Sequence, residues 1–163
     1  MTFVATPLLT SSVMRIEPGW VDYNGHLNQA YYGVLFDRSI DEVLAPVGLG
    51  PDYIVSRNLS FMTVECHTCF VRELMLADPV RVASRILDVD DKRLHMFCEL
   101  VHAEAGWLAA TAEWMFLHVD MASRRTAPWP ADIRDRLDAL KAAGLPLPVP
   151  ERAGRRIGIA RKA

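Results

Sequence analysis

The stretch Trp20-Val-Asp-Tyr-Asn-Gly-His-Leu-Asn-Gln-Ala-Tyr-Tyr32 contains the change from strand to helix around which this chain is organised. An apolar run ends at Asp22, a turn with Asn24 and Gly25 follows, and a helix begins after Asn28. The N-terminal amides of a helix can polarise a carbonyl group, and a carboxylate that faces them can activate water or attack directly. The stretch therefore predicts acyl chemistry at the junction of a strand and a helix.

The residues that follow Asn28 predict one long amphipathic helix. Asparagine is a good N-cap, and charged residues occupy the side opposite the apolar positions. Pro46 and Gly48 end this helix, and residues 52–57 are expected to form a short helical turn. The apolar positions are Tyr32, Leu35, Phe36, Ile40, Val43 and Leu44.

Five strands are expected, one before this helix and four after it. The first covers residues 12–21, and the later runs are rich in β-branched or alternating apolar residues. Asp90-Asp91 and Ala105-Gly106 supply turns for antiparallel hairpins. One apolar helix against a curved antiparallel five-stranded sheet is an α+β layer arrangement. The four later runs are residues 58–70, 79–88, 93–103 and 107–120.

The C-terminal part predicts a helix and then an extended segment. Residues 130–143 have an apolar helical face, with Gly144 as the expected C-cap. Residues 145–150 alternate proline with apolar residues and are expected to extend in polyproline style. The tail, residues 151–163, carries five basic residues and one acidic residue. A solvated or disordered tail, a strap on a partner subunit and a contact to phosphate all stay open as interpretations.

Composition narrows the class of protein. A chain of 163 residues can form one domain with a real core, and 51% hydrophobic with 23% charged residues is typical of soluble globular proteins. The net charge of -2 gives no general argument for binding to nucleic acid or membranes. Neither a signal peptide nor a membrane span is expected. Cys66, Cys69 and Cys98 are interpreted as reduced thiols of a cytoplasmic protein.

A metal site is not expected around Cys66 and Cys69, although His67 lies between them. Zinc needs about four ligands, and no second Cys/His pair has matching spacing. Alternation along a strand would also place the two cysteines on opposite faces.

Asp22, His26 and Asn28 are the candidate catalytic residues. Asp22 can act as base or nucleophile, although aspartate is also common in turns. Gly25 permits a positive φ or a close approach of substrate. His26 could hydrogen-bond Asp22 or be a satisfied polar residue beneath the helix. Asn28 is expected to cap the helix, and the amides of residues 28–30 would face the reacting oxygen.

Polar residues inside apolar strand runs are a second set of candidates. Glu65 and His67 are expected to share one strand face with Thr63. Such residues are costly when buried without partners, so they form either a structural ion pair or part of a pocket. Glu113 is expected to pair with Arg or Lys on a neighbouring strand, and His95 is expected to be an ordinary strand residue.

The pattern Asp22-x-x-Gly-His-Leu-Asn-x-x-Tyr31 resembles the active-site segment of hotdog-fold acyl-CoA thioesterases of the 4-hydroxybenzoyl-CoA thioesterase type. The resemblance covers about residues 10–130. It implies a hotdog thioesterase domain in residues 1–130, with a C-terminal helix and basic tail in residues 131–163. Four further segments resemble a branch that includes betainyl-CoA thioesterases of carnitine breakdown. These segments are Thr63–His67, Asp91–His95, Ala109–Glu113 and Leu117–Asp120.

The resemblance implies hydrolysis of a small acyl-CoA to a free acid and CoA, without a separate cofactor. The phosphates of coenzyme A need surface cations. Aromatic faces of Tyr31 and Tyr32 would attract a quaternary ammonium group, and Glu65 could add an anionic wall. The residues expected to bind substrate are Gly25, Gln29, Tyr31, Tyr32, Glu65 and His67. The candidates for the CoA phosphates are Lys92, Arg93, Arg124 and Arg125.

The resemblance also implies an oligomer, because hotdog proteins pair into dimers with active sites built from two subunits, and a tetramer of two such dimers stays open. A homodimer is expected independently, since runs 93–103 and 107–120 would leave a sheet edge that must be paired or covered. Two other functions stay open. One is a hotdog dehydratase, although such enzymes usually use a His/Asp pair in a different motif. The other is a non-catalytic acyl-CoA binding or interaction module.

Overall fold

The amphipathic pattern after Asn28 forms one long helix in the computed structural model of the chain, which describes residues 3–159. Helix α1 (Gln29–Leu44) turns its apolar face to the sheet and buries all six predicted positions. It passes into a short 3-10 turn, η2 (Ala45–Val47), and ends at Gly48, whose φ of 96° is left-handed. Helix α2 (Pro51–Arg57) follows. The predicted N-cap and helix end are confirmed.

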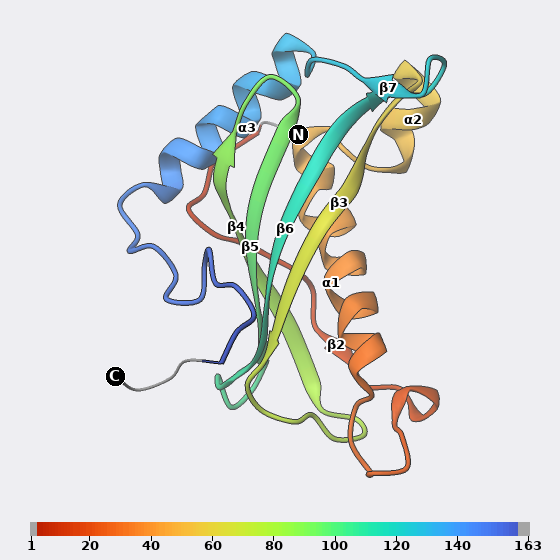
Figure 1. Cartoon of the computed structure of the whole chain (residues 1–163), viewed down its shortest axis with the longest axis vertical. Helices are drawn as coiled ribbons and strands as arrows, with labels where there is room; N and C mark the ends of the chain where they lie inside the picture. The colour runs from red at the N-terminus through yellow and green to blue at the C-terminus, as the bar shows by residue number, and fades with distance from the viewer. Residues whose placement is uncertain (1–2, 160–163) are drawn as a thin grey trace.

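The four long strand runs also form as predicted, within two residues at each end. They are β3 (Leu59–Phe70), β4 (Pro79–Val89), β5 (Arg93–His102) and β6 (Leu108–Asp120). Strands β4, β5 and β6 are joined as consecutive antiparallel hairpins, and β3 pairs with the far side of β6. Figure 1 shows the long α1 running along the twisted sheet. The predicted α+β architecture is confirmed.

The first predicted strand, residues 12–21, is wrong in its extent. Only β1 (Leu9–Thr10) and β2 (Met14–Arg15) form in this region, and both pair with β4. Pro18 has no amide to donate, and it opens the 3-10 turn η1 (Pro18–Trp20). The chain therefore leaves the sheet after β2 and reaches Asp22 through this 3-10 turn.

The free edge of the sheet also differs from the prediction. The strand order is β1-β4-β5-β6-β3, so β5 and β6 lie in the interior and β3 lies at the edge. The short β7 (Arg125–Thr126) pairs only with the end of β6. A bulge between Thr63 and Glu65 interrupts the regular alternation of β3. Side chains beyond the bulge therefore change faces relative to those before it.

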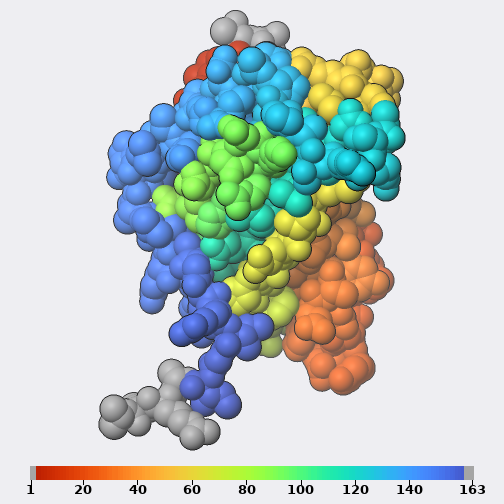
Figure 2. Space-filling model, turned by 45° about the horizontal axis from the view of Figure 1, so that its top comes forward, coloured from red at the N-terminus to blue at the C-terminus, as the bar shows by residue number. Residues whose placement is uncertain are grey.

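The C-terminal residues cover parts of the sheet that α1 leaves open. Helix α3 (Ala131–Gly144) buries Ile133, Leu137 and Leu140 and packs against β4. The chain then crosses the face opposite α1. Arg85 Nη2 donates to the Pro148 carbonyl at 2.6 Å, and the Gly154 amide donates to Glu113 at 2.7 Å. Figure 2 shows this blue segment lying beside the strands. Residues 160–163 of the predicted tail lie outside the described residues. Within residues 3–159, no helix combines the length and apolarity that crossing a membrane requires.

Candidate active site

The loop before α1 folds back on itself and presents the carboxylate of Asp22. The Asp22 amide donates to the His26 carbonyl at 3.1 Å, and the Gly25 amide donates to the Asp22 carbonyl at 3.0 Å. Gly25 has a φ of 84°, which confirms the predicted left-handed turn position. The Asn24 amide donates to Asp22 Oδ1 at 2.8 Å. The turn therefore fixes one carboxylate oxygen of Asp22.

Asn28 connects this carboxylate to the first turn of the helix. Its Oδ1 accepts from the Ala30 amide at 3.0 Å, which is the N-cap bond, and its Nδ2 donates to Asp22 Oδ2 at 3.3 Å. The Asn28 amide donates to the Trp20 carbonyl at 2.9 Å. Among the three amides expected to face a substrate, the Gln29 amide alone has no partner in the hydrogen bonds of the described residues. This donor is therefore the one available to an oxyanion.

A cavity of about 450 Å³ opens beside these groups. It lies between the loop that precedes α1, the first turns of α1, and the end of β3 with the residues after it. Chain direction explains this meeting, because β3 returns along α1 and its C-terminal end reaches the start of the helix (Figure 1). The lining residues are Asp22, Tyr23, His26, Leu27, Asn28, Gln29, Tyr32, Phe70, Val71, Arg72 and Glu73.

Aromatic rings form one corner of the cavity. The rings of Tyr32 and Phe70 meet edge to face, with their centroids 5.0 Å apart. Desolvation by burial raises the pKa of the Tyr32 hydroxyl, a backbone hydrogen bond with Leu74 opposes that shift, and the charge of Glu73 adds to it. Tyr31 does not line the cavity. Its ring stacks on Trp20 instead, with centroids 5.6 Å apart.

His26 does not bond to the Asp22 carboxylate, so the first interpretation of this residue is wrong. Its Nδ1 lies 3.4 Å from the Leu27 carbonyl, and its Nε2 lies 4.0 Å from Glu73 Oε2. The turn directs the ring away from Asp22 and toward the residues that follow β3. Among the three proposed catalytic side chains, the structure joins Asp22 and Asn28, while His26 occupies another wall of the same cavity.

Glu65 and His67 do not line the Asp22 cavity of the same chain. The two residues share one strand face as predicted, but the bulge in β3 separates them from the face of Thr63, so the inclusion of Thr63 is wrong. Thr63 pairs with the buried Phe116, whereas Glu65 and His67 line a second cavity of about 370 Å³ with Glu113. The lining of this cavity includes Gly154 of the C-terminal segment and not Asp22.

The partner of Glu113 differs from the prediction. Glu113 Oε1 lies 2.7 Å from His95 Nε2, and its other oxygen accepts from the Gly154 amide. Among residues 3–159, neither Arg nor Lys forms the predicted pair with Glu113. His95 is therefore not an isolated strand residue, because it shares this half-buried network.

The four basic residues proposed for the CoA phosphates lie at the far end of the sheet from Asp22. Lys92 lies in the β4–β5 turn and Arg93 begins β5, where Arg93 Nε donates to Asp90 at 2.6 Å. That bond is the largest cause that lowers the pKa of Asp90 to about 2. Arg124 lies in the turn after β6 and Arg125 begins β7, at the same end of the sheet (Figure 1).

Arg72 and Glu73 are cavity residues that the sequence interpretation missed. Arg72 is the cation of the Asp22 cavity, with its guanidinium 4.2 Å from the Trp107 ring centroid. No motif spacing connects these residues to Asp22. The order of the elements could have indicated them, because the strand that follows the long helix runs back along it and ends near the start of the helix.

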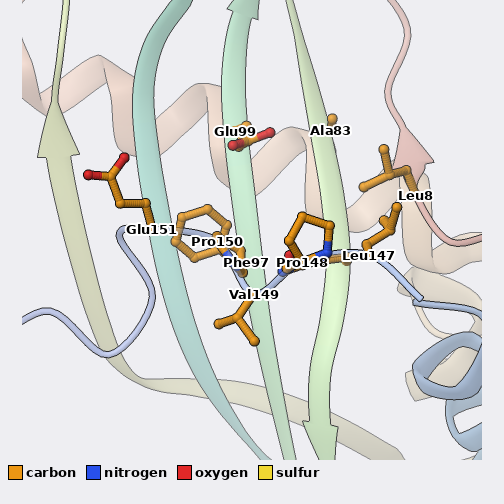
Figure 3. Close-up of a pocket in the computed structure, with 10 residues that line it drawn as sticks. Leu8, Ala83, Phe97, Glu99, Leu147, Pro148, Val149, Pro150 and Glu151 are labelled. Carbon is orange, nitrogen blue, oxygen red and sulfur yellow. The ribbon is translucent and has the colours of Figure 1, made fainter. Parts of the chain in front are cut away.

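A third cavity, of about 320 Å³, lies on the sheet face opposite α1. Figure 3 shows its roof, formed by residues 147–151 over β4 and β5, with Phe97 and Glu99 on the floor. None of the proposed catalytic residues lines it.

Burial raises the pKa of Cys98 to about 12, which removes that thiol as a nucleophile. Within residues 3–159, no group of three or more His, Cys, Asp or Glu residues is arranged to hold a metal ion.

Asn28 both caps α1 and donates to Asp22, and substitutions of this residue test the capping role. Asn28→Ala should lower the free energy of unfolding by about 1 kcal/mol, because it removes the N-cap. Asn28→Ser should restore most of that stability, since serine caps well, but it cannot donate an amide proton to Asp22. Urea unfolding of the three proteins measures the difference. Equal stability of Asn28→Ala and the parent would contradict the capping role.

Comparison with known proteins gives consistent similarities. A model of the thioesterase-like superfamily matches residues 16–137. A betainyl-CoA thioesterase of Pseudomonas aeruginosa is 38% identical over 152 residues, covering 93% of this chain and 96% of that protein. An L-carnitine dehydrogenase/betainyl-CoA thioesterase of Rhizobium meliloti is 33% identical over 144 residues, covering 88% of this chain and 29% of that protein. A Staphylococcus aureus protein solved in complex with CoA has a TM-score of 0.87 and 27% identity, with 98% of this chain and 100% of that chain covered.

Proposed function

The chain belongs to the thioesterase-like superfamily of hotdog-fold acyl-CoA thioester hydrolases, and on that premise we propose that its Asp22 cavity hydrolyses a small acyl-CoA, with betainyl-CoA preferred. The Asp22 carboxylate and the unpartnered amide of Gln29 border the same cavity at the start of α1. A general base or nucleophile and an oxyanion donor are the two parts that thioester hydrolysis requires.

The proposed reaction begins when the thioester carbonyl oxygen accepts a hydrogen bond from the Gln29 amide. Asp22 takes a proton from a water molecule, and the water oxygen bonds to the carbonyl carbon. The negative charge that develops on the carbonyl oxygen is stabilised by this amide and by the N-terminus of α1. The carbon–sulfur bond then breaks, and the proton goes to the thiolate of CoA. If Asp22 attacks directly, water instead cleaves the resulting anhydride.

Asn24 and Asn28 hold Asp22 in place for either route. Each donates to a different oxygen of the carboxylate, at 2.8 and 3.3 Å. A base or nucleophile held in this way loses little conformational freedom on reaching the reactive geometry. Asn28 acts here as a positioning residue, because it contacts Asp22 and the helix terminus.

Two observations support a betainyl acyl group. Relatives similar along most of this chain are betainyl-CoA thioesterases or contain that activity. The edge-to-face rings of Tyr32 and Phe70 also form an aromatic corner in the cavity. A quaternary ammonium group cannot donate a conventional N–H hydrogen bond, and aromatic faces attract it at about 0.5–2 kcal/mol each. Asp22 and this corner border the same cavity.

We also propose that the enzyme is at least a dimer. Strand β3 has a hydrogen-bonded neighbour, β6, on one side, and its other edge is open along residues 59–70 of the described chain. Exposed strand edges favour pairing with another chain. Light scattering should give at least twice the 18.3 kDa chain mass, and a monomer fully active at nanomolar dilution would contradict this assembly.

Replacement of Asp22 tests the catalytic site. Asp22→Asn should lower kcat by at least about 10²-fold, because general-base catalysis contributes about 10²–10⁴-fold and loss of a nucleophile can cost more. Circular dichroism should remain that of the parent. Asp135→Asn, an exposed acid-to-amide change on α3, is the matched control and should keep parental activity. Parental turnover in Asp22→Asn would remove this residue from the mechanism.

A pair of substrates tests the acyl preference. Betainyl-CoA and 3,3-dimethylbutanoyl-CoA have the same shape and differ in the positive charge. Two aromatic contacts of about 1 kcal/mol each predict that kcat/KM favours the charged substrate by at least about thirty-fold. Free-thiol release measures both reactions. Equal values would leave a general acyl-CoA thioesterase, binding without thiol release would indicate a binding module, and hydration of an enoyl-CoA would indicate a dehydratase.

A further inference from the structure

The loop after β3 carries an acidic side chain to the wall of the Asp22 cavity. The Val71 and Arg72 amides both donate to the Ala109 carbonyl, at 2.9 and 3.0 Å, which ties the start of this loop to β6. On its other side, the Leu27 amide donates to the Leu74 carbonyl at 2.7 Å. Glu73 lies between these two anchors, so its backbone is fixed relative to the catalytic loop.

The charge of Glu73 is not neutralised by the neighbouring cation. The Arg72 guanidinium packs over Trp107, 4.2 Å from the ring centroid, and makes no ion pair with Glu73 among the described residues. The nearest basic group is His26 Nε2, at 4.0 Å, which carries charge only when it is protonated. The Glu73 side chain is 68% exposed and borders the cavity. Its carboxylate is therefore available to a charged ligand.

Glu73 also lies beside the aromatic corner. Its charge contributes to the raised pKa of the Tyr32 hydroxyl, behind the larger effect of burial. The Tyr32 side chain is buried and closes the inner side of the corner, while Phe70 is half-exposed and closes the outer side. One carboxylate and two rings that border one cavity form a suitable environment for a quaternary ammonium group.

We propose that Glu73 is a specificity residue that selects a cationic acyl group in the Asp22 cavity. This inference rests on the proposed function, since it names the group that distinguishes charged from neutral substrates at that site. The aromatic corner of Tyr32 and Phe70 contacts the methyl groups, and Glu73 supplies the opposite charge. The sequence had suggested Glu65 for this role, but within one chain Glu65 lines another cavity. Asp22 is left to the chemical step.

The test compares substrate preference across three variants of the full-length protein. For each variant, kcat/KM is measured with betainyl-CoA and with 3,3-dimethylbutanoyl-CoA, and their ratio is taken. Glu73→Gln keeps the shape and removes the charge, so the ratio should fall by about ten-fold, a moderate effect because the carboxylate is partly screened by water. The loss should be a higher KM for betainyl-CoA. Glu73→Asp keeps the charge and should recover part of the ratio.

Glu104→Gln is the matched control, because Glu104 is an exposed acid in the β5–β6 turn outside the cavity. This variant changes the net charge equally and should keep the parental ratio. An unchanged ratio in Glu73→Gln, or an equal loss for both substrates, would overturn the role of Glu73. Absence of any charge preference in the parent enzyme would instead refute the proposed substrate, so the two failures are distinguishable.

Discussion

Backbone amides in the first turn of an α-helix have no partners inside the helix, and the loop before α1 is arranged around this constraint. The Asn28 side chain caps one amide, and its second polar atom reaches Asp22. The Trp20 carbonyl accepts from the Asn28 amide. Among the described residues, the Gln29 amide is left without a partner, beside a carboxylate held by two donors. The requirement to satisfy a helix terminus therefore produces the arrangement that thioester hydrolysis needs.

The rest of the fold determines what can approach this terminus. Because α1 and β3 run in opposite directions, the end of β3 reaches the start of α1 and brings an aromatic ring, a cation and an acid to the cavity. The hydrogen bonds from Val71 and Leu27 fix that loop to β6 and to the loop that carries Asp22. The reacting group would thus be held by α1, and its acyl substituent would be recognised by the residues after β3.

Local sequence patterns were sufficient for most of the fold. The N-cap at Asn28, the buried face of α1, the four long strands and the turn at Gly25 all depend on neighbours within a few residues. The errors have local and long-range causes. Pro18 ended the first strand early, and the β3 bulge changed the face of Glu65 and His67. The pairing of His95 with Glu113 depends on strand register, and the arrival of Arg72 and Glu73 depends on topology, which spacing along the chain does not encode.

In the proposed reaction, the start of α1 binds the thioester carbonyl while Asp22 supplies the base or nucleophile. A crystal structure with a ketone analogue of betainyl-CoA, in which a methylene group replaces the thioester sulfur, tests it most directly. We expect the ketone oxygen within about 3.2 Å of the Gln29 nitrogen, and the trimethylammonium group in the corner of Tyr32, Phe70 and Glu73. An analogue bound with its carbonyl away from Gln29 and Asp22, for example in the cavity beneath residues 147–151, would rule out this mechanism.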